Sequence, residues 1–346
     1  GLMNHFRGDG TNYLSVRGDE YKRLTPVYDW MKIPGATIVQ LDKMPGENEI
    51  QKWGLTDYVG AVTDGTYGAV GLDFKSPHTG LAAKKVWFFF DKTYVCLGTD
   101  ISSRMKNQVL TTVNQCLLNG QVTVSDADGI HPQERGSRMK KGVRWVVHDR
   151  VGYYFLNKEN VILSNQRTEG SWKIANRQTT TPTDIIQQDV FTLSVDHGSY
   201  PNNEGDAYMV VPSADPLSIE KQVEEEGVVV LANCPDVQAV RHDGLNMAYA
   251  VFYKGGTLRI HDKIVVEMDA PGMLMVKYND AGEILTLGVS DPTRFMKKLH
   301  LSVNQRIVGT AQENIQTEWD GKQALTRISV DLPQNEYAGK SVIYNK

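Results

Sequence analysis

The sequence predicts an all-β protein. Runs rich in β-branched and aromatic residues recur every 8–15 residues or so, at about the spacing that β-sandwiches show. The 31 Gly and 13 Pro residues are spread along the chain, as turns between many short strands require. Asp91-Lys92 and Asp149-Arg150 each separate two such runs, which indicates antiparallel hairpins.

The expected strands follow from residue type, because β-branched and aromatic side chains fit a pleated, half-buried surface. In order, they cover residues 85–90, 93–97, 143–148, 151–155, 228–231, 247–253, 257–260, 263–268, 272–278, 284–288, 298–303, 324–332 and 340–344.

One segment predicts a helix. Asp215 is a good N-cap, Pro216 suits the first helical position, and residues 217–226 continue to Gly227. At roughly 150 residues per domain, the 346 residues correspond to about two domains. We place the boundary near residue 222, so that the domains span residues 1–222 and 223–346.

Charge and hydropathy exclude several functions. Lys and Arg number 37 and Asp and Glu 41, so the net charge is −4 and no global positive field recruits nucleic acid. No apolar run reaches the roughly 18–20 residues that span a bilayer. Cys96, Cys116 and Cys234 are far apart, which fits neither a disulfide framework nor a metal site. The start, with Gly1 before Met3, reads as cut or engineered and shows no signal peptide.

Two segments carry candidate chemistry. Residues 135–144 hold five cations, among them Arg138 and Lys140, which could bind sulfate or carboxylate groups. A solvated hairpin tip is the alternative. Residues 18–37 interleave acids, including Glu20 and Asp29, with aromatic residues such as Trp30. Carbohydrate sites need rings that stack on sugars and acids that orient donors, although a packed loop explains the pattern equally well.

This second segment resembles polysaccharide lyase family eight, which includes chondroitin AC, hyaluronate and xanthan lyases, and it is most similar to the chondroitin AC lyases. The similarity continues in the family's order over nearly the whole chain. The matching sequences are GDEY (18–21), PVYDWMKIPGAT (26–37), DYVGAVTDGTYG (57–68), AKKVWFFFD (83–91), VCLG (95–98), TTVNQ (111–115), VLAN (230–233), QAVRH (238–242) and PQNEYAG (333–339).

The resemblance implies an antiparallel β supersandwich followed by a smaller C-terminal β-sandwich. It also implies an N-terminal helical toroid as a partner domain, which carries the catalytic Asn, His, Tyr and Arg and which nothing here matches. The family cleaves acidic polysaccharides by β-elimination and leaves 4,5-unsaturated uronosyl products. That step requires no metal or other cofactor. Because the substrates are large polymers, we expect a periplasmic or secreted protein.

Residue roles also follow from the resemblance. An acidic residue of the β part holds the catalytic Arg, and Asp29 is the first candidate, with Glu20 second. Trp87 matches a ring that stacks on sugar, and ordinary core packing is the alternative. Some relatives bind structural calcium, which Asp64 and Asp73 match in spacing, although Val62 stands where one acidic ligand is expected.

Three functions follow as hypotheses. The first is the C-terminal β part of a chondroitin or hyaluronan lyase, inactive without the toroid, or of a lyase with xanthan specificity. The second is a non-catalytic module that binds carbohydrate or supports the toroid. The third is a stand-alone hydrolase, which would need two facing carboxylates.

Overall fold

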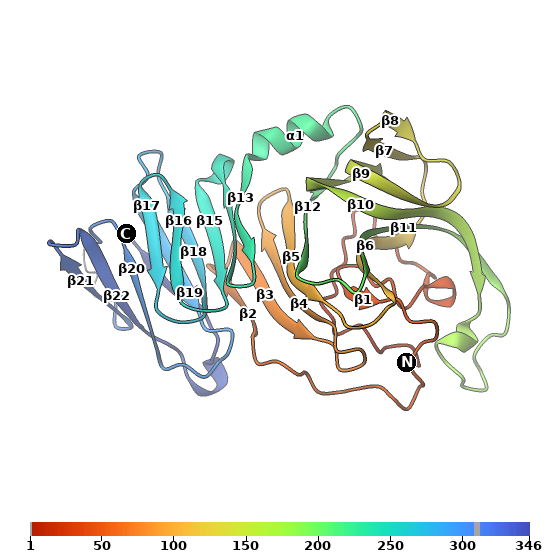
Figure 1. Ribbon diagram of the computed structural model, residues 1–346, viewed down its shortest axis with the longest axis horizontal. Coiled ribbons are helices and arrows are strands. Elements are labelled where there is room, and N and C mark those ends of the chain that lie inside the picture. The colour runs from red at the N-terminus through yellow and green to blue at the C-terminus, as the bar shows by residue number, and fades with distance from the viewer. Residues whose placement is uncertain (1, 308–311) are drawn as a thin grey trace. The chain divides into compact units, whose positions relative to one another are not determined.

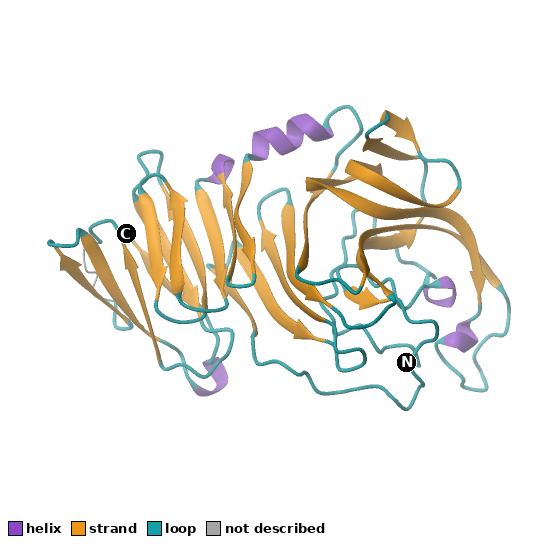
Figure 2. Ribbon diagram, viewed as in Figure 1, coloured by secondary structure: helices purple, strands orange, loops and turns teal. Residues whose placement is uncertain are grey.

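The computed structural model describes residues 2–307 and 312–346 and confirms the all-β prediction (Figures 1 and 2). The chain forms two compact units. The first contains Gly1–Leu55, Phe74–Ala83 and Asp100–Ile219, and the second contains Thr56–Asp73, Lys84–Thr99 and Glu220–Lys346. Among the described residues, no helix has both the length and the apolar character needed to cross a membrane.

The first unit is built on a sheet with the strand order β1-β6-β11-β10-β12, and β7, β8 and β9 extend it through the pairing of β9 with β10. Two 3-10 turns, η1 (Thr25–Val27) and η2 (Trp172–Ile174), lie in its loops. The strands are β1 (Thr37–Val39), β6 (Gln108–Leu117), β7 (Val122–Asp126), β8 (Gly129–Pro132), β9 (Gly136–His148), β10 (Val151–Gly170), β11 (Ile186–Ser199) and β12 (Glu204–Pro212).

Strand β10 is 20 residues long and changes partner along one edge. Its first part, from Val151 to Phe155, pairs with β12, and its second part, from Val161 to Gly170, pairs with β11. The register with β9 shifts on both sides of Glu159, which lies between these two parts. Such shifts bend a strand and leave residues without ladder partners, so Glu159 sits at an irregular point of the sheet.

The N-terminal segment forms its own apolar cluster in the first unit. It buries Phe6, Trp30 and Ile33 together with Val190 of β11. Gly170 requires a bare α-carbon here, because a Cβ atom would lie 1.9 Å from the backbone oxygen of Pro26. The segment from residue 2 to residue 36, which includes η1, therefore packs on the sheet and positions the candidate site.

The second unit contains three sets of strands. The first set runs in the order β5-β4-β3-β2, although residues 74–75, 82–83 and 100–102 of its strands belong to the first unit. The other sets are a six-stranded sheet, β13-β14-β15-β18-β19-β23, and a five-stranded sheet, β16-β17-β20-β22-β21. The elements are β2 (Val59–Thr63), β3 (Gly68–Lys75), β4 (Ala82–Phe89), β5 (Tyr94–Ser102), α1 (Ile219–Glu226), β13 (Val228–Cys234), β14 (Val237–His242), η3 (Asp243–Leu245), β15 (Met247–Phe252), β16 (Gly256–His261), β17 (Ile264–Met268), β18 (Gly272–Tyr278), β19 (Ile284–Ser290), β20 (Lys298–Val303), β21 (Ile315–Asp320), β22 (Leu325–Asp331), η4 (Asn335–Tyr337) and β23 (Val342–Asn345).

The six- and five-stranded sheets enclose one apolar core, to which both contribute alternate residues. Strand β20 shows this alternation, with Leu299 and Leu301 buried and His300 exposed. Strand β15 is buried on both faces, since residues of β3 and β4 pack on its outer side. Tyr249 donates a hydrogen bond to the carbonyl of Phe89 at 2.9 Å, and its ring stacks on Phe88.

The predicted helix is confirmed as α1, which begins two residues later than expected. Asp215 Oδ1 accepts hydrogen bonds from the backbone N–H groups of Leu217 and Ser218, at 2.8 and 3.1 Å. The predicted domain boundary at residue 222 lies inside α1. The compact units follow a different division, because residues 56–73 and 84–99 group with the C-terminal residues.

Candidate active-site loop

The loop before η1 is organised around the carboxylate of Glu20, which is only 7% exposed. Its Oε1 accepts from the N–H groups of Val16 and Arg17 at 2.6 and 2.5 Å, and its Oε2 accepts from the Ser15 hydroxyl at 2.7 Å and the Gly18 N–H at 2.9 Å. Burial opposes the charged form, but these hydrogen bonds outweigh it and lower the pKa of Glu20 to about 2. Glu20 is therefore ionised near neutral pH and fixes the loop.

Arg17 connects this loop to the turn between β9 and β10. Its Nε lies 2.8 Å from Oδ2 of Asp149, and its Nη2 lies 3.0 Å from Oδ1 of Asp19. Asp149 also accepts a hydrogen bond from Asn119 Nδ2 at 2.7 Å. The guanidinium is thus held between two carboxylates, which fixes the loop to the sheet of the first unit.

Three tyrosines lie close together behind the loop. Tyr13 is 47% exposed, its ring centroid is 4.9 Å from that of Tyr21, and its hydroxyl is 3.4 Å from that of Tyr28. The Tyr21 hydroxyl donates to the carbonyl of Leu14 at 3.0 Å. Burial raises the pKa of both Tyr21 and Tyr28 above the usual range. These two phenols therefore stay protonated at neutral pH and are poor proton acceptors.

Trp30, a predicted substrate contact, is 6% exposed. Its ring packs edge-on against Tyr28 at 5.2 Å, and the Arg7 guanidinium lies 5.5 Å from its centroid. Among the described residues, its indole nitrogen has no hydrogen-bond partner. The enclosed ring favours the alternative reading, in which this part of the loop is packed rather than open to sugar.

Asp29 lies at the tight turn after η1, and its side chain is 39% exposed. Oδ1 accepts from the N–H of Met31 at 3.0 Å, and Oδ2 lies 2.5 Å from Nζ of Lys32. Gln115 on β6 holds the turn: it accepts from the N–H of Asp29 at 2.8 Å and donates to the carbonyls of Asp29 and Lys32 at 3.0 and 2.6 Å. A carboxylate offers about four lone-pair positions, so Asp29 can accept further donors.

A hollow of about 110 Å³ opens beside Asp29. Asp29, Lys32, Gln115 and Val27 of η1 line part of it, and the remaining side chains share one face of β9, β10 and β11. These are Ser137, Ile162, Ser164, Gln166, Thr168, Val190, Thr192 and Ser194. Hydroxyl and amide groups can both donate and accept, so the hollow suits hydrogen bonding to a polar ligand.

The other predicted sugar contacts lie outside this loop. Trp87 on β4 is 6% exposed, and Lys85 Nζ is 5.7 Å from its ring centroid. That burial favours the core alternative for Trp87, and its contact with sugar stays a prediction.

The cationic segment does not form a solvated hairpin tip, which was the alternative to an anion site, because it lies along strand β9. Arg138 is exposed and pairs with Glu134 at 2.8 Å, and Lys140 lies 3.3 Å from Asp126. Both cations already have carboxylate partners. Their binding to substrate stays a prediction, and an anionic ligand would compete with those partners.

Asp64 and Asp73 do not fit one calcium site. Asp64 lies in the β2–β3 turn, where its carboxylate is paired with Lys277 and accepts from the N–H groups of Thr66 and Tyr67. Asp73 lies opposite Tyr58, at the other end of the hairpin, roughly 20 Å along the strand from Asp64. Within residues 2–307 and 312–346, no group of three or more His, Cys, Asp or Glu side chains could hold a metal.

Sequence reasoning missed the groups that hold the Glu20 loop and the Asp29 turn. Glu20 shows a local signal, since its donors lie two to five residues earlier. Gln115 could not be found in this way, because its bonds to the Asp29 turn join residues 86 apart. Arg17 is likewise fixed by Asp149, which is remote in the sequence.

Two family profiles match successive parts of the chain. The profile of the polysaccharide lyase family 8 super-sandwich domain matches residues 1–223, and that of the family's C-terminal beta-sandwich domain matches residues 229–300. The chain belongs to polysaccharide lyase family 8.

Particular members of the family are similar to this chain over most of its length. Chondroitinase-AC of Pedobacter heparinus is 35% identical over 346 residues, which cover 99% of this chain and 46% of that protein. Hyaluronate lyase of Thermasporomyces composti is 28% identical over 91% of this chain and 40% of its own length. The solved structure of a chondroitinase AC lyase, studied with oligosaccharides, superposes with a TM-score of 0.85 and 33% identity over 99% of this chain and 48% of that one. The chain thus spans less than half the length of these relatives.

Proposed function

We propose that this chain is the β part of a lyase that cleaves chondroitin, chondroitin sulfate or hyaluronan by β-elimination. The observation that carries the proposal is the 35% identity to a chondroitinase-AC over 99% of the chain. Relatedness to a hyaluronate lyase supports hyaluronan as a second substrate. A xanthan lyase of a Bacillus species is 27% identical over 84% of this chain, which makes xanthan the alternative substrate.

The reaction needs a base, a group that neutralises the uronic carboxylate, and a proton for the leaving oxygen. The base removes the proton α to the carboxylate, the C4–O bond breaks, and the departing oxygen takes up a proton, which leaves a 4,5-unsaturated uronosyl product. Neutralising the carboxylate stabilises the enolate that develops. Tyr21 and Tyr28 are unsuited as the base because burial raises their pKa. The Asn, His, Tyr and Arg that the family uses are supplied by the helical part of the longer protein.

Within this chain, Asp29 is the first candidate to hold the catalytic Arg and Glu20 the second. Two lone-pair positions of Asp29 remain open after Met31 and Lys32 are counted, and the side chain is partly exposed. Glu20 accepts four hydrogen bonds from its own loop, so it orders the loop first. A carboxylate that fixes a catalytic side chain improves turnover without touching the reacting atoms, so both are positioning residues.

The decisive experiment uses the longer protein with its helical part. Purified enzyme is incubated with chondroitin sulfate, unsulfated chondroitin, hyaluronan and xanthan, and the absorbance of the unsaturated uronosyl product is recorded. The proposal expects product from at least one of the first three. Product from xanthan alone would show that xanthan, and not chondroitin or hyaluronan, is the substrate. No product from any polymer would leave a non-catalytic binding or scaffold module.

The polymeric substrates also support a location in the periplasm or outside the cell, since such chains are too large to enter the cytoplasm intact. Fractionating the source cells and probing each fraction with an antibody against this chain tests that location. Recovery in the cytoplasmic fraction alone would contradict it.

A further inference from the structure

Two adjacent loops of the second unit display aromatic rings to solvent. The first covers residues 291–297 and the second residues 333–340, which includes η4. Phe295 is 74% exposed and Tyr337 is 61% exposed. Apolar groups that gather on one surface and are rimmed by polar residues mark interaction sites. We call Arg294, Phe295, Lys297, Tyr337 and Lys340 the aromatic–basic patch.

The first loop is held in one conformation by Asp291, which is 2% exposed. Its Oδ1 accepts from the N–H and hydroxyl of Thr293 at 2.8 and 2.6 Å, and its Oδ2 accepts from the N–H of Met296 at 2.8 Å. Arg294 adopts a left-handed backbone conformation, with φ of 65°. Phe295 is therefore presented by an ordered turn, which lowers the entropic cost of binding through it.

The second loop packs directly on the first. Gln334 Nε2 donates to the carbonyl of Met296 at 2.9 Å, and the N–H of Leu332 donates to the carbonyl of Lys297 at 2.9 Å. Gly339 has φ of 89°, and a Cβ atom there would lie 3.1 Å from Cγ of Arg294. The close approach of the loops thus uses a glycine, and it brings the two exposed rings onto neighbouring loops.

The patch has a local positive charge although the whole chain is negative. Arg294, Lys297 and Lys340 form no ion pair with any described residue. Lys340 Nζ lies 5.8 Å from the ring centroid of Tyr337. Lys298 pairs with Asp331 at 3.1 Å, and Asp291 is buried beneath its loop. The exposed acids beside the patch are Glu336 and Glu313, and Glu313 lines a hollow together with Lys340. The three cations outnumber these two exposed acids. The surface therefore favours an anionic partner.

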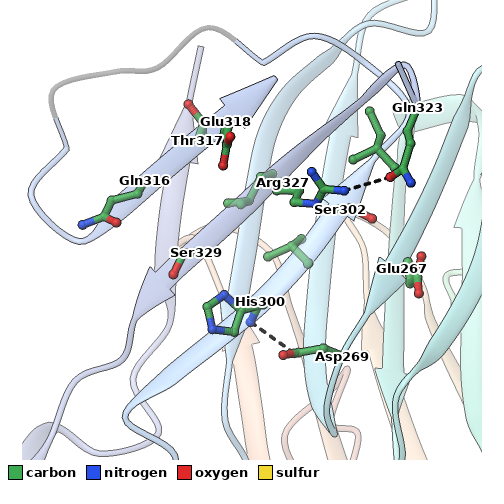
Figure 3. A pocket seen from close by; sticks show the side chains of 13 residues that line it. Glu267, Asp269, His300, Ser302, Gln316, Thr317, Glu318, Gln323, Arg327 and Ser329 are labelled. Carbon is green, nitrogen blue, oxygen red and sulfur yellow. Dashed lines mark hydrogen bonds between the residues drawn. The ribbon is translucent and has the colours of Figure 1, made fainter. Parts of the chain in front are cut away.

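A hollow on the five-stranded sheet of the same unit shows the opposite character. It measures about 740 Å³, and Glu267, Asp269 and Glu318 line it (Figure 3). Its Arg327 is already engaged, because the guanidinium donates to Asp320 Oδ2 and Gln323 Oε1, each at 2.8 Å. An acidic polymer would meet repulsion there, so the aromatic–basic patch is the better anion site of the two.

We propose that the aromatic–basic patch is an auxiliary binding site for acidic polysaccharide on the C-terminal sandwich. The rings would stack on the apolar faces of sugar units, and the free cations would pair with uronic carboxylates or sulfates. The site would raise the local concentration of polymer without taking part in bond cleavage. This inference rests on the proposed function for the identity of the polymer.

The test measures binding of the full chain, residues 1–346, to chondroitin sulfate and hyaluronan by isothermal titration. Phe295→Ala combined with Tyr337→Ala removes the rings, and Arg294→Ala combined with Lys297→Ala removes two cations. Trp319→Ala is the matched control, since that ring is 39% exposed in the same unit but lies between Glu318 and Asp320. Circular dichroism and thermal unfolding confirm that each variant is folded.

The inference expects each double variant to weaken binding at least tenfold, the cation variant to reduce its salt dependence, and Trp319→Ala to bind as wild type. No binding by the wild-type chain would overturn it, as would unchanged affinity in both double variants. Equal binding of polyglutamate would overturn the role of the rings. Binding to phosphatidylserine vesicles in place of the polysaccharides would assign the patch to a membrane surface.

Failure of this inference is separable from failure of the proposed function. In the longer enzyme, the ring variant should raise KM for polymer while kcat on a short oligosaccharide is unchanged. An enzyme that cleaves polymer with unchanged KM in the ring variant refutes the auxiliary site alone. If the longer protein shows no lyase activity but residues 1–346 still bind polysaccharide through the patch, the proposed function alone is refuted.

Discussion

Lys32 Nζ lies 2.5 Å from Oδ2 of Asp29, three residues away, and both residues line a hollow that also contains several hydroxyl groups. The pair orients the Asp29 carboxylate while leaving it 39% exposed. Three hydrogen bonds of Gln115 and the hydrogen bond from the Lys32 N–H to the Asp29 carbonyl keep this turn in place. An Arg from another part of the protein could therefore bind Asp29 without rearrangement of the loop.

Removing the Asp29 carboxylate tests this role. In the longer enzyme, Asp29→Ala should lower turnover at least about tenfold, because a catalytic Arg loses an orienting partner. The effect should fall on kcat with little change in KM. Glu47→Ala is the control, since Glu47 forms an exposed pair with Arg177 at 2.9 Å. A rate equal to wild type would move the role to Glu20 or to neither residue.

Glu20 makes the stability of the folded chain fall at acidic pH. Its pKa is lowered from 4.5 to about 2, so its contribution is present above about pH 4.5 and is lost as the pH falls through 2. Glu20→Gln should destabilise the chain at pH 7, because an amide cannot accept all four hydrogen bonds. The variant should also lose that part of the acid dependence. Urea unfolding of both proteins between pH 2 and pH 7 measures the difference, and parallel curves would contradict the assignment.

Glu159 makes the stability of the chain depend on pH in the opposite direction. Burial, Asp206 and Glu204 raise its pKa from 4.5 to about 8 despite a hydrogen bond from the backbone of Ala207. Because the folded state holds the proton more tightly, its contribution is complete below about pH 4.5 and is lost as the pH rises through 8. Glu159→Gln, which mimics the protonated acid, should remove this alkaline loss. Thermal unfolding from pH 5 to pH 9 checks it, and an unaltered alkaline slope would count against a half-buried, protonated Glu159.

Substitutions of Trp87 distinguish a role in core packing from a role in sugar binding. With the ring 6% exposed, Trp87→Ala should cost about 3–5 kcal/mol of stability, as large-to-small core changes do. Trp87→Phe should keep most of the stability and, if the ring is core, the wild-type affinity for polysaccharide. Chemical unfolding measures the stability of each variant, and titration with chondroitin sulfate measures its affinity for polysaccharide. A stable Trp87→Phe protein with affinity weakened by about 1–3 kcal/mol would support stacking on sugar instead.

Much of the fold could be predicted from residue type. The strands of the C-terminal sandwich alternate apolar and polar residues or are continuously apolar, and the structure has strands at all the predicted positions there. Several strands were not predicted, and β6 and β11 are two of them that carry many polar residues. Those residues find partners across the sheet: Thr111 Oγ1 lies 2.8 Å from His197 Nε2, and Thr112 Oγ1 lies 3.0 Å from Ser194 Oγ. Bonds between residues more than 80 apart leave no local signal.

The candidate site could be predicted only in part. The interleaved acids and rings of residues 18–37 identified the loop, and its two acids lie there as ordered carboxylates. Exposure could not be predicted from residue type, so Trp30 and Trp87 were expected as sugar contacts although their rings are buried. The spacing of Asp64 and Asp73 suggested one ion site, but a β-hairpin carries them to opposite ends.

The central claim is that this chain positions groups for an elimination whose acid–base residues lie in the helical part of the longer protein. The most direct measurement is the formation of unsaturated uronosyl product when residues 1–346 alone are incubated with chondroitin sulfate, beside the longer enzyme at equal molarity. The account predicts product from the longer enzyme and none from the chain alone. Sustained turnover by the chain alone would contradict it.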